Sequence, residues 1–136
     1  MADGNESAGG CLCGAVRYTV QGELRPVVNC HCGQCLRWHG HFAAYSAAPW
    51  SAIRLQGESE LQWYDSSSFA RRGFCRRCGS SLFWERPGSG QLSIAAGSLD
   101  RPTGLKTIRH IFTADLADYY EITDGHERLP AGQGTG

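Results

Sequence analysis

The sequence lacks several features that would place it in common protein classes. Its apolar runs fall far short of the ~20 residues that a membrane-spanning helix needs. Neither sign of charge is in excess, because 13 basic residues balance 13 acidic ones. This balance argues against nucleic-acid binding through bulk charge and against a polybasic membrane anchor. The polar start MADGNESAGG has no basic stretch followed by apolar residues, so we expect no secretory signal and a cytoplasmic location.

Cysteine is the residue type that stands out, with seven in 136 residues. A chain of this length is most simply one domain that buries roughly two-thirds of its unfolded surface. It therefore does not need disulfides merely to stay folded. In a reducing compartment, clustered cysteines indicate metal ligands or catalytic groups, and the odd number leaves one thiol over in any complete set of disulfides.

Short segments with strand character, separated by glycine-rich turns, fill most of the chain. Val16, Tyr18 and Val20 alternate with polar residues, the pattern of a half-buried strand. The other predicted strands are 26–30, 41–47, 51–57, 61–66, 80–85, 91–97 and 107–113. A short helix is predicted over about 113–122, capped by Thr113 or Asp115. The sequence therefore predicts a mainly β domain over 9–125, a sandwich or curled sheet, with a disordered tail at 1–8 and a flexible one at 126–136.

The cysteines fall into three motifs, CLCG at 11–14, CHCGQC at 30–35 and CRRCG at 75–79. Zinc takes four tetrahedral ligands and favours thiolates, and two cysteines one or two residues apart can reach one ion where a glycine allows a sharp turn. One such pair supplies half of a shell, so its complement must come from elsewhere in the chain. One grouping joins the first and third motifs, which leaves three thiols in the second. The residues grouped in this way are Cys11, Cys13, Cys75 and Cys78, and then Cys30, Cys32 and Cys35.

Spacing does not fix this grouping. Cys11 and Cys13 could instead join the second motif, leaving Cys75 and Cys78 as a redox pair. Three protein ligands with a free position are typical of a catalytic zinc, whereas a histidine as fourth ligand would close a structural site. His31 lies between two cysteines, and an extended chain would point it to the other face. The other histidines that could close the shell are His39, His41 and His110.

These motifs resemble those of the glutathione-dependent formaldehyde-activating enzyme family, which includes centromere protein V. The resemblance runs from Gly9 to about Asp124. The stretches that carry it are GGCLCGAVRY at 9–18, CHCGQCLRWHG at 30–40, RRGFCRRCGSSLFW at 71–84, AAGSLD at 95–100 and RHIFTADLADYYEITDG at 109–125.

The resemblance implies an Mss4-like zinc-binding β domain with two zinc ions. It places a structural zinc on Cys11, Cys13, Cys75 and Cys78, and an active-site zinc on Cys30, Cys32 and Cys35. It implies a carbon–sulfur lyase of the S-hydroxymethylglutathione synthase type, acting on glutathione and formaldehyde or another small carbonyl. Two stretches differ from the family pattern, Tyr119-Tyr120 and LRWHGHF at 36–42, and both concern the substrate rather than the cysteines.

Other polar and aromatic residues are weaker candidates for substrate contacts. Basic residues near the zinc could bind the glutathione carboxylates or simply offset thiolate charge, and histidines could move protons or be packed structurally. The serine runs 66–68 and 80–81 have no aspartate–histidine partner in a recognisable pattern, so we interpret them as turns. The arginines are Arg37, Arg71, Arg72, Arg76 and Arg77, and the tryptophans expected in the core or a pocket wall are Trp38, Trp50, Trp63 and Trp84.

Three functions remain open from the sequence. The first is a zinc enzyme that acts on the thiol adduct of a small carbonyl, with no nucleic-acid or membrane partner. The second is a non-enzymatic zinc module that binds a protein or chromatin partner. The third is a redox or metal-buffering protein that uses the CHCGQC thiols.

Overall fold

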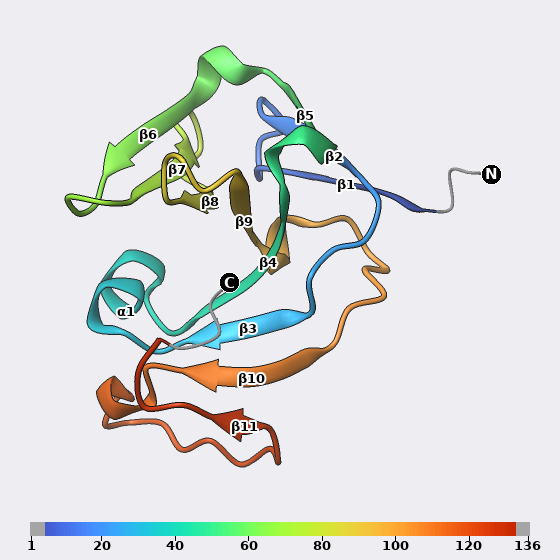
Figure 1. The fold of residues 1–136 in the computed structure, drawn as a ribbon. Coiled ribbons are helices and arrows are strands. Elements are labelled where there is room, and N and C mark those ends of the chain that lie inside the picture. The colour runs from blue at the N-terminus through green and yellow to red at the C-terminus, as the bar shows by residue number, and fades with distance from the viewer. Residues whose placement is uncertain (1–4, 133–136) are drawn as a thin grey trace. The chain divides into compact units, whose positions relative to one another are not determined.

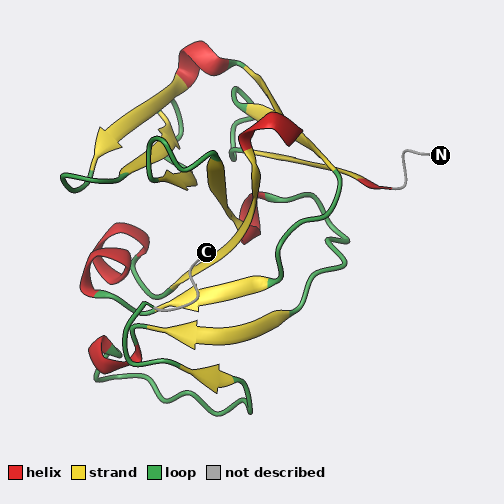
Figure 2. Ribbon diagram, in the orientation of Figure 1, coloured by secondary structure: helices red, strands yellow, loops and turns green. Residues whose placement is uncertain are grey.

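The computed structural model describes residues 5–132, and strands dominate them (Figures 1 and 2). This part of the chain contains eleven strands, one α-helix and short 3₁₀ turns, so the predicted mainly β class is confirmed. It divides into two compact units, which we describe separately. Residues 5–25 and 46–104 belong to unit 1, and residues 26–45 and 105–132 belong to unit 2.

Unit 1 contains a three-stranded antiparallel sheet in the order β1-β2-β5. Its bounds are β1 (Glu6–Gly10), β2 (Arg17–Gln21) and β5 (Ile53–Gln56). The alternation predicted for the second of these strands is present, because Tyr18 and Val20 are buried while Thr19 and Gln21 are more exposed. The period-two pattern therefore gives this sheet one face directed into the core.

Unit 1 also contains four antiparallel strands in the order β6-β7-β8-β9. Their bounds are β6 (Leu61–Asp65), β7 (Arg71–Cys75), β8 (Ser81–Glu85) and β9 (Gln91–Ala95). The rings of Tyr18 in β2 and Phe83 in β8 meet edge to face at 5.3 Å, so the two groups of strands share one core. The 3₁₀ turns of this unit are Trp50–Ala52, Glu58–Glu60 and Ala96–Ser98.

Unit 2 is built on a parallel pair of strands, β3 (Val27–Cys30) and β10 (Thr107–Ile111). The short β11 (Glu127–Arg128) runs parallel to β10 on its other side, and β4 (Ala43–Pro49) runs antiparallel to β3. The helix α1 (Gly33–His39) begins three residues after β3 ends (Figure 1). The chain passes from unit 2 into unit 1 within β4, whose last four residues belong to unit 1.

The helix predicted over about 113–122 is wrong. The structure has only a 3₁₀ turn there, Thr113–Asp115, followed by irregular chain. The backbone amides that would start a helix bond elsewhere, Thr113 N–H to the carbonyl oxygen of Leu129 and Ala114 N–H to that of Pro130. Pairing with the C-terminal segment therefore replaces the helical hydrogen bonds.

The predicted tails are also too long. Strand β1 begins at Glu6, inside the segment 1–8, and β11 lies inside the segment 126–136. Residues 1–4 and 133–136 lie outside the described residues. No helix in the described part of the chain is long and apolar enough to cross a membrane.

Candidate metal centres

Four cysteines of unit 1 form one cluster. Cys11 directly follows β1 and Cys75 ends β7, while Cys13 and Cys78 lie in the turns after them. Their sulfur atoms all lie within 4.8 Å of one another, with 3.7 Å between Cys11 and Cys13 and 3.8 Å between Cys13 and Cys75. Four sulfurs at this spacing fit the tetrahedral shell of a structural metal such as zinc.

Backbone and hydroxyl donors surround these sulfurs. The N–H groups of Val16 and Arg77 each donate to a cysteine sulfur at 3.3 Å, those of Cys11 and Cys75 respectively. Gly14 and Gly79 follow the two pairs with φ of 83° and 81°, a conformation that favours glycine and lets the chain turn back. Donors aimed at sulfur stabilise the thiolate form that a metal requires.

Ser80 supports the same cluster through its hydroxyl group. The Ser80 Oγ lies 3.1 Å from the Cys78 sulfur and accepts a hydrogen bond from the Leu12 N–H at 3.0 Å. The Ser80 hydroxyl is the main cause that lowers the pKa of the Cys78 thiol to about 5. The sequence analysis assigned Ser80 no role at a metal site, and its position two residues after Cys78 is the signal that could have suggested this contact.

Three cysteines of unit 2 form the second cluster, which we call the triad (Cys30, Cys32 and Cys35). Cys30 ends β3, Cys32 precedes α1 and Cys35 lies buried in the first turn of that helix. The three sulfurs lie within 4.8 Å of one another. Cys32 also caps the helix, because its sulfur accepts the Cys35 N–H at 3.3 Å. This cap is unusual for cysteine, which explains why the sequence did not predict α1.

The crowded thiols of the triad suit a bound cation. Hydrogen bonds with Cys32 and Cys35, together with burial, raise the pKa of the Cys30 thiol well above its ordinary value. Three neighbouring thiolates repel one another, so full ionisation needs a positive charge among them. A thiophilic divalent ion would supply it, and the donor set therefore fits zinc.

The grouping of the seven cysteines into four and three is the one the sequence favoured, and none of the seven forms a disulfide. Within residues 5–132, neither cluster includes a histidine or carboxylate. Each histidine proposed as a fourth ligand bonds elsewhere. His31 Nε2 lies 2.8 Å from His110 Nδ1, His39 Nε2 lies 3.0 Å from the Tyr45 hydroxyl, and His41 Nδ1 lies 2.9 Å from the Tyr119 hydroxyl.

Most of the candidate arginines have carboxylate partners in unit 1. Arg76 and Arg77 both pair with Glu60, at 2.9 and 3.3 Å, and Arg71 pairs with Glu85 at 2.7 Å. Arg72 is 2% exposed. The remaining candidate, Arg37, is exposed on α1, the helix that carries Cys35.

The tryptophans of unit 1 pack as expected of wall and core residues. Trp63 lies between the Arg71 guanidinium, 3.9 Å from its ring centroid, and the ring of Phe83. The Trp50 Nε1–H donates to Glu85 at 2.6 Å, and Trp84 is half-buried in β8. Trp38 is half-buried in α1 of unit 2.

The serine run 66–68 contributes to the turn between β6 and β7. Ser66 Oγ donates to the carbonyl oxygen of Ala70 at 3.4 Å, and Ser67 Oγ accepts the Phe69 N–H at 3.3 Å. These local bonds agree with the turn that the sequence predicted.

Comparison with known proteins gives consistent relationships. Residues 6–115 match the family model described as glutathione-dependent formaldehyde-activating enzyme. The chain is 36% identical over 81 residues to an uncharacterized lyase of Schizosaccharomyces pombe, a match over 58% of this chain and 57% of that protein. The chain therefore spans little more than half the length of this relative. The crystal structure of a Rhodobacter sphaeroides protein is similar with a TM-score of 0.59 and 27% identity, over 74% of this chain and 97% of that one.

Proposed function

This chain belongs to the glutathione-dependent formaldehyde-activating enzyme family, and we propose that it is a zinc-dependent carbon–sulfur lyase. The proposed reaction joins a thiol such as glutathione to a small carbonyl such as formaldehyde. The enzyme would also catalyse the reverse reaction, which releases the thiol and the carbonyl. The thiol sulfur bonds to the carbonyl carbon, and the thiol proton passes to the carbonyl oxygen, with no change of oxidation state. The lyase named among the relatives supports this class of reaction.

The observation that carries the proposal is the composition of the triad. It brings three thiols together, and no fourth protein ligand joins them in the described residues. A zinc ion held there would offer a free coordination position, where an entering thiol is kept as thiolate at neutral pH. The four-cysteine cluster has a full set of ligands, so we assign it a structural ion and the chain two zinc ions in all.

The residues around the triad suggest how the thiol partner would be held. Glutathione carries two carboxylates, and Arg37 on α1 is exposed and lies two residues after Cys35. Its guanidinium suits a carboxylate through paired hydrogen bonds. We propose Arg37 as a binding residue for an acidic thiol.

Zinc content tests the metal assignment first. Protein purified without oxygen should hold two zinc ions per chain, and Cys30→Ser, Cys32→Ser and Cys35→Ser should each hold one while remaining folded. A parent with one ion, unchanged in these variants, would show that the triad holds free thiols. The redox or metal-buffering interpretation would then replace the enzyme.

Exchange kinetics test the reaction. The exchange between ¹³C-labelled formaldehyde and its glutathione adduct, followed by NMR, should be faster with the zinc-loaded parent than without protein, and Cys35→Ser should remove the difference. Arg37→Ala should weaken saturation by glutathione more than saturation by 2-mercaptoethanol, which has no carboxylate. A zinc-loaded parent that leaves the exchange at its spontaneous rate would refute the enzyme and favour a non-catalytic zinc module.

A further inference from the structure

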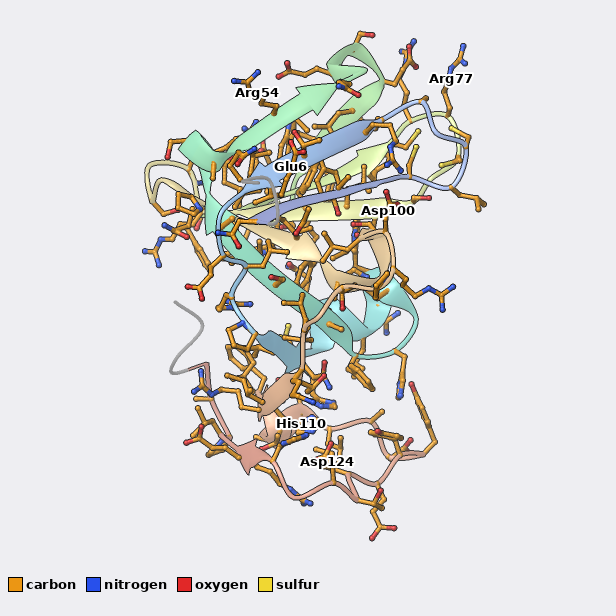
Figure 3. All side chains as sticks on the ribbon, turned by 90° about the vertical axis from the view of Figure 1, so that its right-hand side faces the viewer. Glu6, Arg54, Arg77, Asp100, His110 and Asp124 are labelled. Atoms are coloured by element: carbon orange, nitrogen blue, oxygen red, sulfur yellow. The ribbon has the colours of Figure 1, made fainter. Side chains whose placement is uncertain are left out.

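A chain of three polar side chains runs through unit 2 beside the triad. The His31 Nε2 lies 2.8 Å from the His110 Nδ1, and the His110 Nε2 lies 2.9 Å from a carboxylate oxygen of Asp124. His31 and His110 are almost fully buried, at 0% and 1% exposure, whereas 41% of the Asp124 side chain is exposed. Figure 3 shows His110 on its strand and Asp124 beside it in the following loop.

The carboxylate fixes the protons along this chain. The contact with His110 lowers the pKa of Asp124, so the carboxylate is ionised and can only accept. His110 Nε2 therefore carries a proton and donates to Asp124. With that single proton on its ring, His110 presents Nδ1 to His31 as an acceptor. His31 in turn donates from Nε2, which leaves its own Nδ1 as an acceptor. That Nδ1 is buried and has no hydrogen-bond partner among the described residues.

Aromatic rings hold His31 on its remaining sides. Its ring centroid lies 5.0 Å from that of Phe42, and it stacks on Tyr120 with the centroids 6.3 Å apart. The hydrogen bond to His110 sets the direction of the His31 ring, and the two aromatic rings pack against its faces. A buried imidazole with one unpartnered nitrogen is costly, so its retention needs a role that the remaining contacts support.

The position of His31 in the polypeptide sequence indicates its role. It separates two residues of the triad, and its backbone N–H donates to the carbonyl oxygen of Ile111 at 3.0 Å. Cys30 is held before it by pairing with β10, and Cys32 is held after it by the start of α1. Because neighbouring residues of an extended chain point to opposite sides, a fixed His31 ring fixes the directions of both cysteine side chains.

We propose that Asp124 and His110 are positioning residues for the triad. Through His31 they hold the backbone between Cys30 and Cys32 so that the three sulfurs face one point and the imidazole stays away from it. This inference rests on the proposed metal at the triad. Asp124 lies beyond residues 6–115, the span of the family match.

The C-terminal segment keeps Asp124 in place. The His126 N–H donates to a carboxylate oxygen of Asp124 at 3.1 Å, and Arg128 donates to the carbonyl oxygen of Ile122 at 2.9 Å. Arg109 of β10 pairs with Glu127 of β11 at 3.0 Å. The segment predicted as a flexible tail thus holds Asp124, the exposed member of the Asp124–His110–His31 series.

Two substitutions of His110 separate its two contacts. In His110→Asn the side-chain oxygen can take the place of Nδ1 and accept from His31, without any need for Asp124. In His110→Gln the side-chain amide can take the place of Nε2 and donate to Asp124, but the acceptor for His31 is lost. We expect zinc binding at the triad to weaken about tenfold in His110→Gln and to stay near the parent value in His110→Asn.

Asp124→Ala supplies a test at an exposed position. It should weaken zinc binding at the triad about tenfold in the parent background, but have no further effect when combined with His110→Asn. The matched control is Asp100→Ala, which removes an exposed carboxylate paired with Arg17 at 2.6 Å in unit 1.

Competition with a chelator measures zinc release from each variant, and the four-cysteine cluster in the same chain serves as internal control. Long-range ¹H–¹⁵N NMR reads the histidine protons independently of zinc and should find both His31 and His110 protonated on Nε2 in the parent. A His110 protonated on Nδ1, or equal zinc binding in the parent, His110→Gln and Asp124→Ala, would overturn the inference. A parent whose triad binds no zinc would refute the proposed function instead, and the NMR result would show whether the hydrogen-bonded chain exists without it.

Discussion

Breaking the four-cysteine cluster should destabilise unit 1 by an amount set by the loop that the cluster closes. We choose Cys13→Ser because Cys13 is exposed, so the substitution itself costs little packing. Cys13 and Cys75 are 62 positions apart in the sequence. A cross-link that closes a loop of this length removes conformational freedom from the unfolded chain worth about 4 kcal/mol.

Urea unfolding of the zinc-loaded protein measures this difference. Tryptophan fluorescence reports mainly on unit 1, which contains Trp50, Trp63 and Trp84. The free energy of unfolding should fall by about 4 kcal/mol in Cys13→Ser. A chelator should lower the parent to the level of the variant and leave the variant itself nearly unchanged, because the variant has already lost the cross-link.

Leu12→Ser is the matched control for this experiment. Leu12 is the neighbouring residue and is 88% exposed, so its replacement should change the free energy of unfolding by less than about 0.5 kcal/mol. The free energy of unfolding of Cys13→Ser could instead lie within about 1 kcal/mol of the parent value, the scale of an ordinary point substitution. The cluster would then not act as a cross-link, and the loop argument would be wrong.

Three further predictions concern the fold around the clusters. Gly57→Ala should cost more than Gly22→Ala in urea unfolding: both glycines have positive φ, but a Cβ on Gly57 would collide with the carbonyl oxygen of Ala15, whereas Gly22 has open space. Tyr18→Phe should cost about 1 kcal/mol, because the buried hydroxyl loses a 2.6 Å hydrogen bond; equal stability would show that the bond adds nothing. Burial, with help from neighbouring histidines, lowers the pKa of His31 to about 4, so the folded state disfavours its protonation and stability should fall as pH drops from 6.5 toward 4. His31→Gln should reduce that fall, and an identical pH profile for parent and variant would contradict the assignment.

Local patterns in the sequence were sufficient for the cysteine motifs and for eight of the eleven strands in the described residues, whereas β1, β7 and β11 were not predicted. Alternation over Val16, Tyr18 and Val20 reports which face is buried, and this depends on neighbours in the chain alone. The cysteine motifs carry their own turns, so each pair can be recognised without knowledge of the rest of the fold. The spacing of the motifs fits more than one grouping, so the pairing of Cys11 and Cys13 with Cys75 and Cys78 came from the family resemblance, and the structure brings these four sulfurs together.

Elements that depend on distant partners could not be predicted in this way. The segment 113–122 has residues that a helix accepts, but its first amides pair with Leu129 and Pro130. The strand β11 is two residues long and forms only beside β10. The contact of His31 with His110 joins positions 79 apart, and neither residue has a local pattern that points to the other.

The two clusters differ in how far apart their ligands lie in the sequence. The four-cysteine cluster joins segments about 60 residues apart, so a metal bound there stabilises the fold by closing a long loop. The triad lies within six residues of sequence, between Cys30 and Cys35, so a metal bound there closes almost nothing. Such a site binds metal tightly only if the fold already holds the sulfurs in place. Contacts elsewhere in the fold must then offset the repulsion and lost freedom of the crowded thiols. A buried chain from Asp124 through His110 to His31 is the kind of support that a short ligand motif needs, and loss of metal from the triad should leave the fold intact.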